Sequence, residues 1–308
     1  MRCAFVMSEN GKRRVVVATR KSELALAQCR QFLAQLVARH PHLQIEELHV
    51  VTTGDRIVDR PLSEIGGKGL FLKEIEESLL AGQADFAVHS MKDVPPELHP
   101  GLVIGCIPER EDPRDVIVTQ NGCPLVEVPQ GGLIGTSSLR RGVQLLEHRP
   151  DLKVVPIRGN VGTRIKKCKD GLVNVTVLAQ AGINRLGLQD AVSEVLSPEI
   201  CLPAVGQGTL AIELRRDDAE LSELLLTMQH DETALRTMAE RGVMGAVEGD
   251  CKTPVAAFAE RNGEELRLRA FLSEPDGSNI RRREIRVPWP ESLEEAGGVG
   301  RSLGLSMK

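Results

Sequence analysis

Two arginines stand side by side in the first turn of a predicted helix. The stretch IGTSSLRRGVQL is typical of a strand end, a hydroxyl-rich cap and a helix, with Arg140 and Arg141 in the first turn. A helix N-terminus carries about half a positive charge, so cations there are unfavourable unless a negative group offsets them. Hydroxyls and free N–H groups at this start suit carboxylates or phosphates. The three hydroxyl residues are Thr136, Ser137 and Ser138. We therefore predict a polyanionic ligand here.

Further cations follow other predicted strands. Arg20 follows RVVVAT, Lys92 follows AVHS, Arg158 follows VVPI, and Arg164 lies one helical turn past Asn160. Ligands of open α/β sheets bind beyond the carboxyl ends of the strands, so we expect these side chains to converge between two domains. Any one of them is also compatible with a solvated helix face.

An acidic residue in AVHSMKDVPPE is the candidate catalytic group. Asp93 lies beside Lys92 at the end of an apolar strand and before two prolines. A carboxylate at such a turn serves as a general acid or as the counter-ion of a cationic intermediate. The alternative is that Asp93 caps the turn or pairs with an arginine.

One cysteine differs from the others in its surroundings. Cys251 lies in the turn VEGDCKTPV beside Lys252, and a neighbouring lysine favours the reactive thiolate. The alternative is a small buried hydrophobe, which is our expectation for the other cysteines. They are Cys3, Cys29, Cys106, Cys123, Cys168 and Cys201.

Two other kinds of site have little support. The histidines form no H-E-x-x-H and the cysteines no C-x-x-C, so we expect no metal. The stretch GGKGLF lacks the spacing of a nucleotide-binding loop. It indicates either a loop that closes over the site or a solvated linker.

The elements that position these residues alternate between strand and helix. RVVVATR, IEELHVVTT and DFAVHS are strand-like, with helical stretches between them, which favours a largely parallel sheet covered on both faces. After PEREDPRD the alternation restarts, indicating a second α/β domain. The strand in LPAVGQGTLAIELR is expected to return to the first domain. From about Gly249, alternating residues predict a small antiparallel unit.

Composition excludes several classes of protein. The 308 residues have a net charge of −4, six Phe, one Trp and no Tyr, which argues against a nucleic-acid surface. No apolar run approaches the roughly 18 residues of a membrane span. The first residues have no secretory pattern, so we expect a cytoplasmic protein with reduced thiols.

Taken in order, the motifs resemble the porphobilinogen deaminase family, whose members are also called hydroxymethylbilane synthases. The resemblance runs from about Val15 to about Leu272. Its most specific pieces are HSMKDVP, GTSSLRR and RGNVGTR, which occur in that order. Weaker pieces include ATRKSELALAQ, TTGDRI, LAQAGINRLG, LPAVGQG and EGDCKTPVAA.

The resemblance implies an α/β fold with two domains like those of type II periplasmic binding proteins around a cleft, plus a small α+β domain. The expected boundaries are residues 1–108 with 209–227, then 109–208, then 228–308. It also implies a monomeric transferase of tetrapyrrole (heme) biosynthesis that binds neither nucleic acid nor membrane. Such an enzyme joins four porphobilinogen molecules head to tail, with release of ammonia, into hydroxymethylbilane. Its dipyrromethane cofactor is joined by a thioether to the matching Cys251.

The family's functional positions transfer by motif. Asp93 matches the catalytic carboxylate, and Lys68 and Phe71 match an active-site loop. The matching cofactor-binding residues are Lys92, Thr136, Ser137, Ser138, Arg140, Arg141 and Arg158. The matching substrate-binding residues are Arg20, Ser22, Arg164 and Arg185.

Three departures from the family pattern stand out. Asp250 replaces a glycine that is more usual before the cofactor cysteine, and Asn174 replaces an aspartate. The chain also stops short of the last helix that we expect, which predicts a trimmed third domain.

The rival interpretation is a non-catalytic cytosolic protein that binds a small polycarboxylate. Such a protein needs neither Cys251 nor Asp93.

Overall fold

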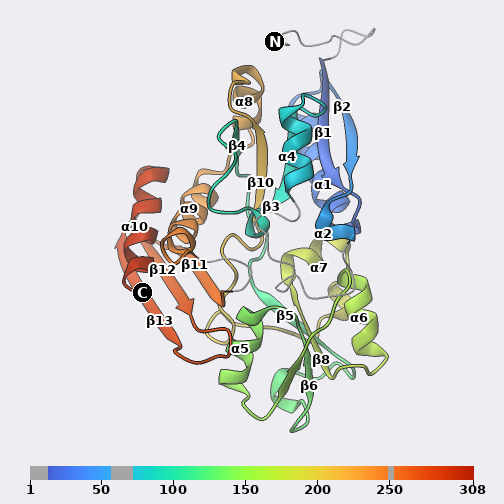
Figure 1. Ribbon diagram of the computed structural model, residues 1–308, viewed down its shortest axis with the longest axis vertical. Helices are drawn as coiled ribbons and strands as arrows, with labels where there is room; N and C mark the ends of the chain where they lie inside the picture. Colours follow the sequence, from blue (N-terminus) through green and yellow to red (C-terminus); the bar gives the residue numbers. More distant parts are fainter. Residues whose placement is uncertain (1–12, 57–71, 249–252) are drawn as a thin grey trace.

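The structure, a computed structural model, describes residues 13–56, 72–248 and 253–308. It contains three sheets, each with its own helices (Figure 1). Two α/β units lie at opposite ends of the long axis, and the third unit lies beside them. Among the described residues, no helix is long and apolar enough to cross a membrane.

The first sheet has the order β2-β1-β3-β10-β4. Its strands are β1 (Arg13–Arg20), β2 (Leu43–Val50), β3 (Phe86–Ser90), β4 (Leu102–Cys106) and β10 (Leu210–Arg215). β1 runs parallel to β2 and β3, whereas β10 runs antiparallel to β3 and β4. The predicted return of β10 is confirmed. The expected largely parallel sheet is confirmed, because β2, β1, β3 and β4 run in one direction and the returning strand β10 is reversed.

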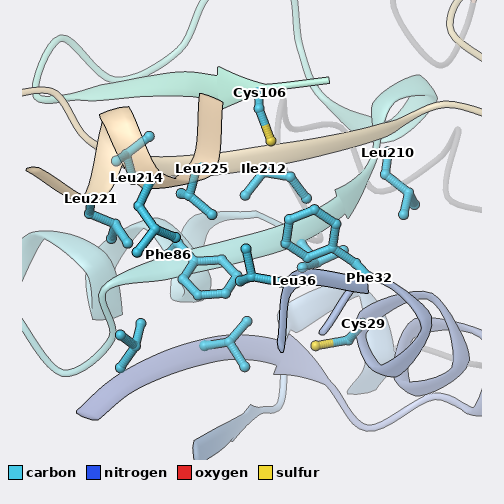
Figure 2. Close-up of a cluster of buried hydrophobic side chains, with 14 of the residues drawn as sticks. Cys29, Phe32, Leu36, Phe86, Cys106, Leu210, Ile212, Leu214, Leu221 and Leu225 are labelled. Carbon is cyan, nitrogen blue, oxygen red and sulfur yellow. The ribbon is translucent and has the colours of Figure 1, made fainter. Parts of the chain in front are cut away.

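Helices pack on this sheet through apolar faces. They are α1 (Glu23–Arg39), α4 (Lys73–Leu80) and α8 (Ala219–Leu226). A short polar helix, α2 (Thr53–Arg56), follows β2. α1 begins at Ser22, whose side chain accepts a hydrogen bond from the Ala25 N–H. Phe32 of α1 meets Phe86 of β3 edge-on, with ring centroids 6.2 Å apart, inside the core in Figure 2.

The second sheet repeats the pattern in the order β7-β6-β8-β5-β9. Its strands are β5 (Asp115–Thr119), β6 (Leu133–Gly135), β7 (Lys153–Val155), β8 (Val175–Ala179) and β9 (Glu194–Val195). Its helices are α5 (Leu139–His148), α6 (Val161–Lys169) and α7 (Gln180–Leu186). Single turns of 3₁₀ helix complete both units: η1 (Met91–Asp93), η2 (Leu125–Glu127) and η3 (Gln189–Ala191). In both sheets four strands run in one direction, and one antiparallel strand lies between the edge strand and the other three, which is the strand order of type II periplasmic binding proteins.

The third sheet is the antiparallel ladder β11-β12-β13, as expected. Its strands are β11 (Val255–Asn262), β12 (Glu265–Leu272) and β13 (Arg281–Pro288), and its helices are α9 (Asp231–Ala246) and α10 (Leu293–Leu305). The described part of this unit ends in a helix, because α10 packs closely on α9, and the expected loss of a further helix stays a prediction. A Cβ at Gly300 would clash with the Ala239 carbonyl oxygen, so only glycine permits this approach.

Candidate active site

A short turn at the end of β3 presents Lys92 and Asp93 to solvent. Met91 and Val94 are each 1% exposed and anchor the turn from below, so the two residues between them face outward. The Asp93 carboxylate makes no hydrogen bond or ion pair with the described residues. The alternative in which Asp93 caps the turn or pairs with an arginine is therefore not observed among them.

Arg140 and Arg141, at the start of α5, share one buried carboxylate. Nη1 of Arg140 donates to Oδ2 of Asp115 at 2.6 Å, and Nη2 of Arg141 donates to Oδ1 at 2.7 Å. The Asp115 side chain is fully buried at the start of β5. Burial alone would raise its pKa, but the two guanidinium groups hold the pKa of Asp115 far below its usual range.

The helix start is therefore partly neutralised from within the protein. Asp115 provides one negative charge beside the arginine pair, in addition to any charge that the predicted polyanionic ligand brings. Gln207 and Cys201 also donate to Asp115, at 2.9 and 3.2 Å. One positive charge of the arginine pair remains without a counter-charge from Asp115.

Lys92 approaches this pair from the other α/β unit. Its pKa is lowered to about 8, first by desolvation and then by Arg141 and Arg140, against the opposing charges of Asp93 and Asp115. Lys92 is nonetheless an exposed residue, so its side chain remains accessible to solvent. The charges of both units thus act on one region.

Two further arginines add like charge to the same region. The pKa of Arg164 is lowered to about 10 by burial and by the positive charges of Arg141 and Arg158. Nε of Arg164 donates to the Gly159 carbonyl at 2.9 Å. We call Lys92, Arg140, Arg141, Arg158 and Arg164 the basic cluster. Burial and the positive charges of neighbouring arginines lower the pKa of Lys92 and of Arg164, which indicates an excess of positive charge around these two residues.

The hydroxyl residues at α5 make local hydrogen bonds. Thr136 is buried and its Oγ1 accepts from the Ser138 N–H, while Ser137 donates to the Ile157 carbonyl at 3.0 Å. Ser138 caps α5 by accepting from the Arg141 N–H. All three line a cavity of about 490 Å³, whose wall also includes the third unit's turn 275–277.

Two other predicted arginines contact groups outside the basic cluster. Arg20 forms a fork with Asp55, with Nη2 2.5 Å from Oδ1. Burial would raise the pKa of Asp55, but hydrogen bonds from Arg20 and Thr52 lower it. Arg185 donates to the Gly208 carbonyl at 2.8 Å, and burial lowers its pKa to about 10.

Several predicted residues lie outside the described residues: Lys68, Phe71, Asp250 and Cys251. Cys29, Cys106, Cys168 and Cys201 are buried free thiols, as expected, whereas Cys123 is half-buried. Within residues 13–56, 72–248 and 253–308, no cluster of His, Cys, Asp and Glu is arranged to hold a metal.

Sequence reasoning missed Asp115 and Asp55, which neutralise predicted ligand-binding arginines. Asp115 has a detectable signal, because DVIVT begins a wholly buried strand with a charged residue. A buried carboxylate requires cationic or hydrogen-bonding partners, and RR in the following helix supplies them. Asp55, in the short TTGDRI stretch, carries no comparable signal.

Comparisons with known proteins agree along nearly the whole chain. A family model described as porphobilinogen deaminase, dipyromethane cofactor binding domain, matches residues 15–223, and one described as the C-terminal domain of porphobilinogen deaminase matches residues 234–308. A protein of Sorangium cellulosum (strain So ce56) named porphobilinogen deaminase is 55% identical over 294 residues, which are 96% of this chain and 98% of that protein.

Similar solved structures are more distant. The periplasmic VFT2 domain of Bordetella pertussis BvgS is 18% identical, with a TM-score of 0.41, over 72% of this chain and 90% of that one. The putative periplasmic sulfonate-binding protein SsuA of Methylobacillus flagellatus KT is 14% identical, with a TM-score of 0.42, over 72% of this chain and 68% of that one. Because these scores are low, the fold assignment depends on the strand orders given above.

Proposed function

The chain belongs to the porphobilinogen deaminase family, and from this we propose which of its residues bind and which react. Its activity is that of a transferase of tetrapyrrole biosynthesis, which joins four porphobilinogen molecules head to tail with release of ammonia into hydroxymethylbilane. Its cofactor is dipyrromethane. The alternative, a non-catalytic binding protein, is not favoured, given 55% identity over almost the whole chain.

The basic cluster fits this cofactor, because each pyrrole bears an acetate and a propionate. Lys92, Arg140, Arg141 and Arg158 hold these carboxylates, helped by the hydroxyls and N–H groups of residues 136–138. Cys251 anchors the cofactor through a thioether. When bound, the dipyrromethane supplies the free pyrrole end to which substrate units are joined. Asp115 orients Arg140 and Arg141 before any carboxylate arrives.

Substrate carboxylates are received by a second group of residues. Burial lowers the pKa values of Arg164 and Arg185 to about 10, and the negative charge of a bound carboxylate would offset the cost of burying each guanidinium. Arg20 and Ser22 approach from the first unit. Lys68 and Phe71 are assigned to the substrate site through their match to the family's active-site motif.

Asp93 is the proposed catalytic residue. Loss of ammonia from porphobilinogen leaves a cationic, azafulvene-like electrophile, which a nearby carboxylate stabilises. The Asp93 carboxylate has no hydrogen-bond or ion-pair partner among the described residues, so it is available for this charge and for proton transfer.

The observation that carries these assignments is the excess positive charge of the basic cluster. This excess charge predicts that Arg164→Met raises the KM for porphobilinogen by about 10-fold or more. That is the loss of affinity expected when a hydrogen bond to a charged group is removed. Lys166→Met is the matched control, because Lys166 lies on the same helix and is exposed beside Asp170. An equal KM in both variants would remove Arg164 from the substrate site.

We also propose three features of the whole molecule. The domains are residues 1–108 with 209–227, 109–208 and 228–308, a division supported by the membership of the three sheets. The protein acts as a monomer in the cytoplasm and binds neither nucleic acid nor membranes. Sedimentation at micromolar concentration tests the monomeric state: a dimer would contradict it.

A further inference from the structure

A half-buried arginine of the third unit holds the chain that follows Asp93. Arg241 of α9 donates to three consecutive backbone carbonyls, those of Val94 at 3.1 Å, Pro95 at 2.7 Å and Pro96 at 3.3 Å. Its Nη1 also lies 3.6 Å from the Met91 sulfur. One guanidinium therefore contacts both ends of the turn that carries Lys92 and Asp93.

Residues 94–96 need a hydrogen-bond donor from another part of the chain to fix their backbone conformation. Pro95 and Pro96 have no N–H and cannot join a backbone ladder through one. A planar guanidinium offers five donors in a fixed geometry, which fixes several carbonyls at once. Arg241 makes no ion pair with the described residues, and burial lowers its pKa to about 10. Its charge is thus balanced mainly by carbonyl dipoles of this segment.

The residue before Arg241 supports the other side of the turn. Oε2 of Glu240 accepts from the Gly206 N–H at 2.7 Å, and its Oε1 accepts from Arg110 at 2.6 Å. Gly206 has φ +67°, and a Cβ there would lie 2.6 Å from Cγ of Met91. The backbone at Gly206 therefore touches the turn, and α9 holds this contact in place.

We propose that Arg241 is a positioning residue for Asp93, and that docking of α9 orients the carboxylate on which ammonia loss depends. This inference rests on the proposed catalytic role of Asp93. Arg241 itself lies behind the turn and touches backbone, so its substitution acts through Asp93. The third unit thereby contributes to the reaction from outside the two α/β units.

The first test compares Arg241→Gln with Arg236→Gln in the holoenzyme. Arg236 is a half-buried arginine of the same helix that donates to the Ala259 carbonyl within the third unit. We expect Arg241→Gln to lower kcat about 10- to 100-fold, the effect of displacing a reacting group by about 1 Å, with KM unchanged. Covalent cofactor content and thermal midpoint should match the control. Equal kcat in the two variants overturns the proposal.

A double-mutant cycle tests whether Arg241 acts through Asp93. In an Asp93→Ala background, Arg241→Gln should reduce single-turnover rate no further, whereas multiplying losses would show an independent effect and overturn the proposal. If Asp93→Ala alone has near-normal turnover, the proposed catalytic role fails instead. If Arg241→Gln does not fold, Arg241→Lys replaces it. Lysine keeps the positive charge but cannot donate to three carbonyls in the geometry of a guanidinium. A normal kcat in this variant would overturn the inference.

Discussion

At the scale of single residues, the site combines one carboxylate without a partner among the described residues and one with several. Asp93 lies exposed between two buried anchors, Met91 and Val94. Asp115 is fully buried and accepts hydrogen bonds from two arginines. A carboxylate that reacts must be accessible, whereas one that orients cations must be fixed. These different surroundings therefore support different roles.

Replacing Asp93 should stop the reaction without removing the cofactor. We expect Asp93→Ala to lower turnover by about 10²- to 10⁴-fold, the usual effect of losing a proton-transfer group. Rapid-quench turnover with porphobilinogen measures the loss, and intact mass verifies that cofactor is still attached. Turnover within a few-fold of the parent would exclude Asp93 from the mechanism.

Replacing Asp115 should destabilise the protein in a pH-dependent manner. Asp115→Asn leaves two buried guanidinium groups without their counter-charge, which should lower the free energy of unfolding by about 3–5 kcal/mol. The folded pKa of Asp115 lies below the unfolded value of about 4, so its contribution is present above pH 4 and is lost as pH falls further. The thermal midpoints of parent and variant should therefore differ at pH 7 and approach each other below pH 4. A constant gap would contradict this assignment.

At the scale of helices and strands, close helix contact in the third unit depends on glycine. Gly300 of α10 faces the Ala239 carbonyl of α9, whereas a Cβ added at Gly298 of the same helix would meet nothing within 4 Å among the described residues. Helix interiors favour alanine over glycine by about 1 kcal/mol when space allows. The two positions therefore predict opposite responses to the same substitution.

Thermal unfolding of two alanine variants tests this packing. Gly300→Ala should lower the stability by about 1–3 kcal/mol through overpacking, and Gly298→Ala should raise it by up to about 1 kcal/mol. Because α9 also carries Arg241, Gly300→Ala should lower kcat as well. Equal midpoints for both variants would show that the helices separate without cost.

Local patterns in the sequence predict most of these elements. They place helix starts at Ser22, Ser138 and Asn160, and each of these residues caps its helix in the structure. The features that the sequence does not predict are those that depend on contacts between distant parts of the chain. No local pattern tells that β10 runs antiparallel beside β3, or that Asp115 meets two arginines 25 and 26 residues later in the chain. Likewise, Arg241 looks in the sequence like an ordinary polar residue of an amphipathic helix.

At the scale of the whole molecule, a net negative protein concentrates positive charge at one place. The chain carries a net charge of −4, yet the pKa values of Lys92 and Arg164 are both lowered by burial and, in addition, by nearby cations. Both α/β units contribute to this charge, so it depends on how they meet. A polycarboxylate bound there would hold the two units together.

Salt should therefore weaken substrate binding more than it slows the reaction. Between about 0.05 and 0.5 M ionic strength the screening length falls severalfold, so the KM for porphobilinogen should rise while kcat changes less. Steady-state kinetics in a non-coordinating salt measures both. A KM independent of salt would show that the basic cluster does not attract substrate.

The central claim is that this chain carries a covalent dipyrromethane and extends it within the basic cluster. The most direct measurement is the intact mass of the denatured protein, before and after incubation with porphobilinogen. We predict an excess of two condensed porphobilinogen units located on the peptide that contains Cys251, and further unit additions after incubation. A mass equal to that of the bare sequence in both samples would contradict the claim.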